Sequence, residues 1–186
     1  MKISLTFLAF FCVLLAALVG QDQLDFSKIS ALPSKRESQE HSHYLNLYKS
    51  KEFEIFGGEK IVLAKEKKPI VIVNFWASWC KPCVKEFPDL NKLTEKYSDN
   101  ILILGVNTDD EDQNKLMKKT KKKYNLKFPL IADKESKLVD AYLVDSIPFS
   151  VIYLNDQVYK KTVGIQDFMS GEFVELFDNA VKKAAN

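Results

Sequence analysis

Apolar and polar positions alternate beyond residue 50 in a way that separates short strands from helices. Residues 70–76 and 101–106 are nearly continuous apolar runs rich in β-branched side chains, which predicts two strands buried on both faces. Residues 81–97 carry apolar side chains at helical spacing, with Pro88 inside the run. A second helix is expected over residues 109–124, because acidic side chains open it and lysines close it.

The remaining elements complete one α/β domain. We expect a hairpin around Gly57-Gly58, a strand at 128–131, a helix at 136–142, a hairpin from strands 149–154 and 158–163, and a last helix from about 167. This order of elements implies a mixed central sheet flanked by helices on both faces, with an N-terminal β-hairpin.

The first twenty residues have the pattern of a targeting segment. Lys2 is followed by an uncharged run over residues 3–19, which is typical of a signal peptide. The run is also close to the roughly 18 residues that a membrane helix needs, so an uncleaved N-terminal membrane anchor is the alternative. Cys12 lies inside the run and is interpreted as an apolar filler. Either interpretation places the rest of the chain in the periplasm or on the outer face of the cytoplasmic membrane.

Residues 21–50 are predicted to link this segment to a domain that spans residues 51–186. The linker is mostly polar, and a helix is expected in it where Tyr44, Leu45, Leu47 and Tyr48 could pack. His41 and His43 lie in this solvated stretch and are not assigned to a metal site.

Charge and composition narrow the classes of function. The chain has 27 basic and 25 acidic side chains, and a net charge of +2 gives no electrostatic case for nucleic-acid binding. The lysines at 118–123 are interpreted as a solvated helix end. Three cysteines are too few to staple a small fold, so the hydrophobic core must supply most of the stability.

The chemistry is expected at Cys80 and Cys83, where a buried strand turns into a helix. The helix N-terminus would stabilise a thiolate on Cys80, and Cys83, one turn later, could attack a mixed disulfide formed there. Half of a zinc site is one alternative, but it needs two more ligands, and no histidine follows His43. A purely structural disulfide is the other alternative.

The residues around this pair carry a family resemblance. Asn-Phe-Trp-Ala-Ser-Trp-Cys-Lys-Pro-Cys at residues 74–83, followed by Glu-Phe-Pro at 86–88, resembles the thioredoxin superfamily and most closely its exported TlpA/ResA branch of thiol-disulfide oxidoreductases. The resemblance covers roughly residues 50–184 and implies a thioredoxin fold.

The resemblance also assigns roles to individual residues. Cys80 matches the nucleophile and Cys83 the resolving cysteine. Pro148 matches a cis-proline beside the pair, and the backbone of Ile147 would bind a substrate strand. Glu86 matches an acidic residue that exchanges protons and tunes the thiols; an ordinary surface glutamate is its alternative.

Other positions near the pair define the expected substrate surface and depart from the family pattern. Trp79, Lys81 and Pro82 are expected to contact substrate, and the lysine adds positive charge near Cys80. Asn74 stands where cytosolic thioredoxins carry a buried aspartate, so that base is absent. Phe149 replaces the usual threonine after the cis-proline, which makes the expected rim more apolar.

The resemblance implies an enzyme that reduces protein disulfides without a cofactor or metal, using only the Cys80–Cys83 couple. Its implied partners are protein disulfides, apocytochrome c before haem attachment among them, and a membrane-bound thiol donor of electrons. Two alternatives stay open: an oxidase that introduces disulfides, and a non-enzymatic copper chaperone. A peroxidase would need a different loop pattern around its cysteine, which the sequence does not contain.

Overall fold

The computed structural model describes residues 34–185. The predicted targeting segment at residues 1–20, Cys12 and the first part of the predicted linker lie outside the described residues. Among residues 34–185, no helix combines the length and the apolar character that crossing a membrane requires. The chain divides into two units at Ser38. The first unit contains a capping box at the start of a helix. The backbone amide of Ser34 donates to the carboxylate of Glu37, and the backbone amide of Glu37 donates to the hydroxyl of Ser34.

The second unit is built on a five-stranded sheet in the order β5-β4-β3-β6-β7. The first three strands in this order are parallel to one another, and the last two add antiparallel pairs. The strands are β3 (Ile70–Trp76), β4 (Ile101–Asn107), β5 (Leu130–Ala132), β6 (Phe149–Leu154) and β7 (Gln157–Val163). The N-terminal hairpin pairs β1 (Glu52–Glu54) with β2 (Lys60–Val62). The predicted mixed sheet and hairpin are therefore confirmed.

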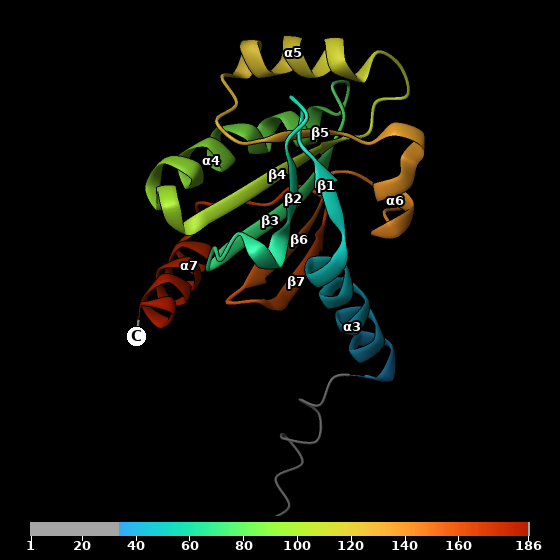
Figure 1. The fold of residues 1–186 in the computed structure, drawn as a ribbon. Coiled ribbons are helices and arrows are strands. Elements are labelled where there is room, and N and C mark those ends of the chain that lie inside the picture. The colour runs from blue at the N-terminus through green and yellow to red at the C-terminus, as the bar shows by residue number, and fades with distance from the viewer. Residues whose placement is uncertain (1–33, 186) are drawn as a thin grey trace, which may run out of the picture. The chain divides into compact units, whose positions relative to one another are not determined.

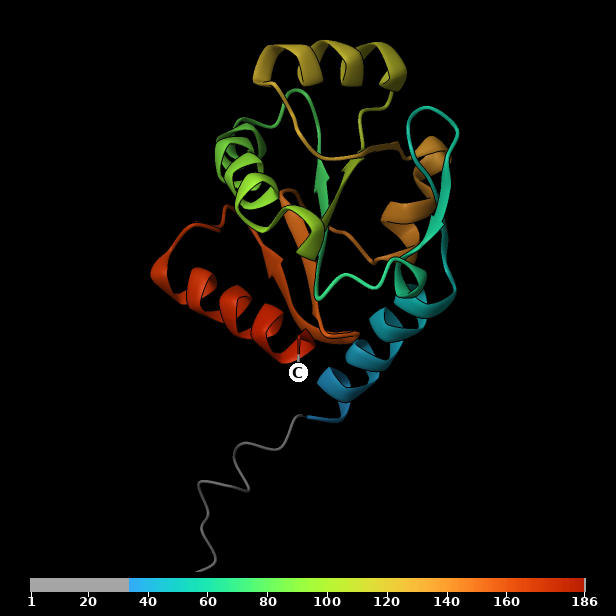
Figure 2. The same ribbon diagram turned by 60° about the vertical axis from the view of Figure 1, so that its left-hand side comes forward.

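Helices cover both faces of this sheet, as Figures 1 and 2 show. Helices α4 and α7 lie on one face, while α6 and residues 39–50 of α3 lie on the other with the hairpin. The helices are α3 (Lys35–Ser50), α4 (Lys81–Tyr97), α5 (Gln113–Tyr124), α6 (Lys137–Ala141) and α7 (Gly171–Ala184), and short 3-10 turns are η1 (Leu63–Lys65), η2 (Ser98–Asn100) and η3 (Lys134–Ser136). The prediction of a helix over 81–97 is confirmed to the residue.

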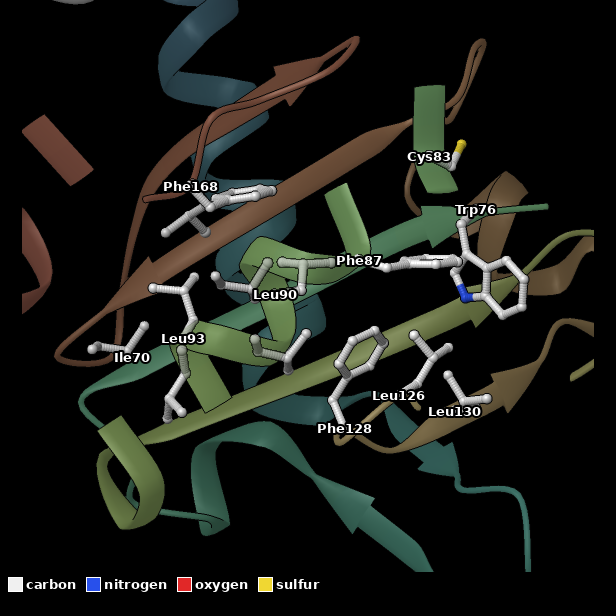
Figure 3. Packing of buried hydrophobic residues seen from close by; sticks show 14 of the residues in the cluster. Ile70, Trp76, Cys83, Phe87, Leu90, Leu93, Leu126, Phe128, Leu130 and Phe168 are labelled. Atoms are coloured by element: carbon white, nitrogen blue, oxygen red, sulfur yellow. The ribbon is translucent and has the colours of Figure 1, made fainter. Parts of the chain in front are cut away.

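Alternate side chains of β3 belong to two hydrophobic cores, one on each face of the sheet. Ile70, Ile72 and Trp76 point toward the α4 and α7 side, whereas Val71, Val73 and Phe75 point toward α3 and α6. On the first side, Phe87 of α4 packs edge-on against Trp76 with ring centroids 5.3 Å apart (Figure 3). Because every residue of β3 is buried, the strand is held on both faces, and its end provides a fixed platform for the turn that follows.

Helix α3 corrects the expected linker over residues 35–50 and confirms the helix expected around Tyr44 and Tyr48. Residues 35–50 are helical, and Tyr44 and Tyr48 are almost fully buried in the second core. The hydroxyl of Tyr44 donates to the carbonyl of Tyr142, and that of Tyr48 donates to Asp156. Two buried aromatic side chains one helical turn apart, together with the partly buried Leu47, supply the apolar contact that holds a helix whose other positions are mostly polar. The folded domain therefore begins before residue 51.

The start of the helix predicted over 109–124 is also corrected. Helix α5 begins at Gln113, and the acidic residues at 109–112 precede it rather than occupy its first turn. Asp109 is instead buried and bonded within the turn described below, and Asp112 has a left-handed backbone. The strand predicted at 128–131 similarly begins at Leu130, and the last helix begins at Gly171 with Ser170 as its N-cap.

Gly105 on β4 offers a direct test of the first core. A Cβ atom there would lie 2.8 Å from Phe128, 2.9 Å from Leu130 and 3.1 Å from the Trp76 indole nitrogen. We expect Gly105→Ala to lower the free energy of unfolding by about 1–3 kcal/mol, the usual cost of overpacking. Urea unfolding measures it. Gly171→Ala, with no atom within 4 Å of its new methyl group, is the control and should change little. Equal effects of both substitutions would contradict this account of the core.

Candidate active site

The turn after β3 places Cys80 at the N-terminus of α4. The Cys80 amide donates to the carbonyl of Ala77 at 3.1 Å, which closes the turn. Cys80 is the N-cap residue, and its Sγ accepts a hydrogen bond from the Cys83 amide at 3.2 Å. The two cysteines form a disulfide, with their Cα atoms 5.3 Å apart. A sulfur at a helix N-cap faces free amides and the positive end of the helix dipole, which favours the thiolate once the bond is reduced.

The two cysteines are buried, whereas the residues next to them are exposed. Both cysteines are largely buried, at 4% for Cys80 and 1% for Cys83. Trp79 precedes them and is 68% exposed, and Lys81 and Pro82 between them are also exposed. Pro82 lies in the first turn of the helix, where its missing amide hydrogen costs no helical hydrogen bond. The three residues predicted to contact substrate thus lie at the surface beside Cys80.

A buried carboxylate beyond the neighbouring strand binds the turn over residues 77–80, the cysteine turn. Asp109, just beyond the end of β4, accepts hydrogen bonds from the backbone amide and the hydroxyl of Ser78, at 3.0–3.1 Å. The Asn107 amide group donates to the same carboxylate at 2.7 Å. Sequence reasoning placed Asp109 in a helix start and missed this role. The available signal was its position directly after a buried strand that neighbours β3.

The Ile147–Pro148 peptide bond is cis, as the resemblance implied. Phe149 pairs with Phe75 across the antiparallel β3–β6 ladder. Pro148 therefore lies one residue further along, level with Trp76, at the end of β3 from which the cysteine turn departs. Ile147 is half-buried and packs against the core that contains both cysteines. The structure thus brings the proline loop and the cysteine turn to the same end of the sheet.

Glu86 is buried, which excludes the alternative of an ordinary surface glutamate. Its side chain projects from α4 with 1% exposure. Oε1 accepts from the Gln166 backbone amide at 2.7 Å, and Oε2 accepts from the Asn74 side-chain amide at 3.2 Å. Burial raises the pKa of Glu86 to about 7, and the charge of Asp89 acts in the same direction, against these two hydrogen bonds. The carboxyl group therefore gains and loses its proton near neutral pH.

Polar side chains on two adjacent strands continue from Glu86 into the sheet. Asn74 of β3 donates to Ser150 of β6 at 2.9 Å as well as to Glu86, and both residues are buried. The Asn74 Oδ1 atom has no hydrogen-bond partner among the described residues. Sequence reasoning noted Asn74 only as a departure and missed Ser150 and Gln166. The contact of Gln166 is made by its backbone, so its side-chain identity carried no signal.

Metal ligands are not gathered near this site. Within residues 34–185, no group of three or more histidine, cysteine, aspartate or glutamate side chains is arranged to hold a metal ion. His43 instead contacts the carbonyl of Ala141 at 2.8 Å through its ring nitrogen. The described site holds the Cys80–Cys83 disulfide and two buried carboxyl groups, those of Glu86 and Asp109.

Known proteins share this sequence pattern and fold. Residues 48–165 match the AhpC/TSA family, which is more than half of the chain. The thiol-disulfide oxidoreductase ResA of a Bacillus cereus strain is 38% identical over 111 residues, which cover 59% of this chain and 63% of that relative. The aligned part therefore spans less than two thirds of its length. ResA of Halalkalibacterium halodurans is 31% identical over 123 residues, which cover 64% of this chain and 68% of that protein.

A solved structure agrees with these sequence matches. StoA from Bacillus subtilis superposes with a TM-score of 0.56 at 25% identity, covering 68% of this chain and 94% of that one. The expected thioredoxin-like architecture is thereby confirmed.

Proposed function

The chain belongs to the AhpC/TSA family, and on that basis we propose that it is a thiol-disulfide oxidoreductase that reduces disulfides of proteins outside the cytoplasm. The observation that carries the proposal is the Cys80–Cys83 disulfide at the N-cap of α4, beside the exposed Trp79. A purely structural disulfide has no need of a helix N-terminus or of a buried carboxyl group with a near-neutral pKa.

The proposed cycle begins with the reduced pair. The Cys80 thiolate attacks one sulfur of a target disulfide, which forms a Cys80–target bond and releases the other target sulfur as a thiolate that takes a proton from solvent. Cys83 then loses its proton and attacks the Cys80 sulfur, and the second target thiolate leaves. Two electrons have passed to the target, and the enzyme holds the Cys80–Cys83 disulfide seen in the structure.

Glu86 is the proposed proton acceptor for Cys83 in the second step. The two residues lie three positions apart on α4, and both are buried. Its pKa of about 7 allows the carboxylate to take a proton at neutral pH and to return it later.

The N-terminal sequence and the resemblance support the proposed place and partners of the reaction. The apolar run over residues 3–19 supports export to the periplasm or to the outer face of the cytoplasmic membrane. There, a membrane-bound thiol protein would reduce the Cys80–Cys83 disulfide and complete the cycle. Apocytochrome c before haem attachment is the proposed target, which would place the enzyme in cytochrome c maturation.

The reduction potential of the couple tests the direction of the reaction. A reductase is expected to have a potential near the thioredoxin value of about −270 mV, whereas a disulfide-introducing oxidase would lie near about −120 mV. Equilibration with glutathione and with dithiothreitol, read by thiol alkylation, measures it. A potential near the oxidase value would overturn the reductase direction, and failure to reduce any accessible protein disulfide, insulin for example, would overturn the proposed activity.

A further inference from the structure

The last residue of β7 and the segment that follows it carry two exposed apolar side chains at the active-site end of the sheet. Val163 is 53% exposed and Ile165 is 52% exposed. Between them, Gly164 has a positive φ of 81°, and its amide donates to the carbonyl of Pro148 at 2.8 Å. Residues 163–166, the rim segment, therefore lie directly against the cis-proline loop.

A second hydrogen bond connects the rim segment to a buried side chain. The Gln166 backbone amide donates to Oε1 of Glu86 at 2.7 Å, while Asn74 of β3 donates to Oε2 of the same carboxyl group. Glu86 thus joins three parts of the fold: the helix that begins at the cysteines, the central strand and the rim segment. The Gln166 side chain donates within the segment, to the carbonyls of Gly164 and Ile165, both at 3.0 Å.

These contacts connect a buried group with an exposed apolar surface. The Gly164 bond fixes one end of Ile165, and the Gln166 bond to Glu86 fixes the other. A hydrogen bond to a charged or strongly polar acceptor that is buried is stronger than one in water, and its loss would leave the partly buried amide of Gln166 unpaired. The position of Ile165 therefore depends on an acceptor atom on residue 86.

We propose that Glu86 is a positioning residue for substrate binding as well as a group that handles protons. Its carboxyl group holds the rim segment so that Val163 and Ile165 form an apolar surface beside the Pro148 loop. The substrate class that fits this surface is an extended, unfolded polypeptide with apolar side chains next to the target cysteine. This inference rests on the proposed disulfide-reductase activity.

Two substitutions of Glu86 separate positioning from proton handling. The amide of Glu86→Gln cannot take up the thiol proton, but its Oε1 can still accept from the Gln166 amide. Its new NH₂ group can donate to the unpartnered Oδ1 of Asn74 after that side chain turns over. Glu86→Leu removes both functions. Glutamine should therefore keep the rim in place, and leucine should release it.

The test compares two peptide disulfides of equal length, one with leucine and phenylalanine beside its cysteines and one with serine and glycine. The readout is the ratio of their kcat/KM values, because any change in thiol reactivity affects both peptides and cancels. We expect the preference for the apolar peptide to fall about tenfold in Glu86→Leu, equivalent to one lost hydrogen bond, and to persist in Glu86→Gln. Equal loss in both variants, or no loss in leucine, would overturn the proposal.

Substitutions in the rim segment provide an independent check if Glu86→Leu does not fold. Gln166→Pro removes the backbone donor, whereas Gln166→Ala removes only the side chain and is its matched control. The preference for the apolar peptide should be lower in the proline variant than in the alanine variant. Equal ratios of kcat/KM in the two variants would overturn the proposal. Ile165→Ala should also lower the preference, and Glu86→Leu should add nothing in that background. Additive effects would contradict action through the rim.

The serine and glycine peptide distinguishes failure of the positioning role of Glu86 from failure of the proposed reductase activity. If wild type and variants reduce the serine and glycine peptide but show no apolar preference, the positioning role fails and the proposed activity stands. If the wild-type protein reduces neither peptide, both fail together.

Discussion

Replacing Cys80 with serine is expected to abolish disulfide reduction, with a loss of several orders of magnitude, because the nucleophile itself is removed. Cys83→Ser should instead stop the reaction halfway, since Cys80 can still attack but nothing resolves the product. The exposed Trp79 beside Cys80 and the 1% exposure of Cys83 both favour attack by Cys80. Mass spectrometry after mixing with a disulfide substrate should find a covalent adduct on Cys80 in the Cys83→Ser protein.

The control for this experiment is a background without the third thiol. Cys12→Ala in every variant leaves only the active-site pair, so that any adduct must form there. An adduct on Cys83 in the Cys80→Ser protein, formed as fast as that on Cys80, would contradict the assignment of nucleophile and resolving cysteine.

The second large effect is on stability against pH, and it concerns Glu86. In the folded protein the pKa of Glu86 is raised to about 7 from an ordinary value of 4.5, chiefly by burial. Between these two values the unfolded chain has released the proton and the folded chain retains it. The contribution of Glu86 to the free energy of unfolding is therefore greatest below pH 4.5 and falls as the pH rises through 7. Above that pH the folded protein is less stable by about 3 kcal/mol than it is below pH 4.5.

Glu86→Gln should remove this pH dependence. Urea unfolding of the oxidised proteins at pH 4.5, 6 and 8 measures it without interference from thiol titration. The stability of the variant relative to wild type should rise over that range by up to about 3 kcal/mol. Glu175→Gln, at an exposed position of α7, is the matched control and should show no such trend. A constant difference between Glu86→Gln and wild type would contradict a buried carboxyl group that ionises near neutrality.

The same variant should change thiol reactivity in the reduced protein. An ionised Glu86 near the pair raises the pKa of a neighbouring thiol by like-charge repulsion, and a neutral amide removes that repulsion. The pH profile of alkylation should therefore move to lower pH by about one unit. Profiles that superimpose would show that Glu86 does not tune the thiols.

The elements that the sequence predicted well are those whose local signals and packing agree. Helix α4 begins at a cap, carries proline in its first turn and buries one stripe, so both of its ends were predictable. Helix α5 was placed too early because charge order favoured a start at 109, while the Asp109 carboxylate bonds Ser78 far away in the sequence. Helix α3 was expected only around Tyr44, Leu45, Leu47 and Tyr48, because most of its other positions are polar.

The active site shows the same division between local and long-range information. Cys80, Cys83 and Pro148 belong to motifs that can be read along the chain. The burial of Glu86 depends on residues 12 and 80 positions away, and one of those contacts is made by a backbone amide that every residue except proline possesses. Such a partner becomes visible only when the chain is folded.

The edges of the central sheet limit how another polypeptide can attach. At the β5 edge, the Phe56 amide beside the N-terminal hairpin already donates to the carbonyl of Leu130. At the other edge, β7 presents Lys160 and Lys161 to solvent, and flanking lysines oppose strand addition. An unfolded protein in a crowded compartment therefore gains little by pairing along either edge. In the proposed function, its backbone pairs instead with the short stretch at Ile147, at the end of the sheet from which the cysteine turn departs.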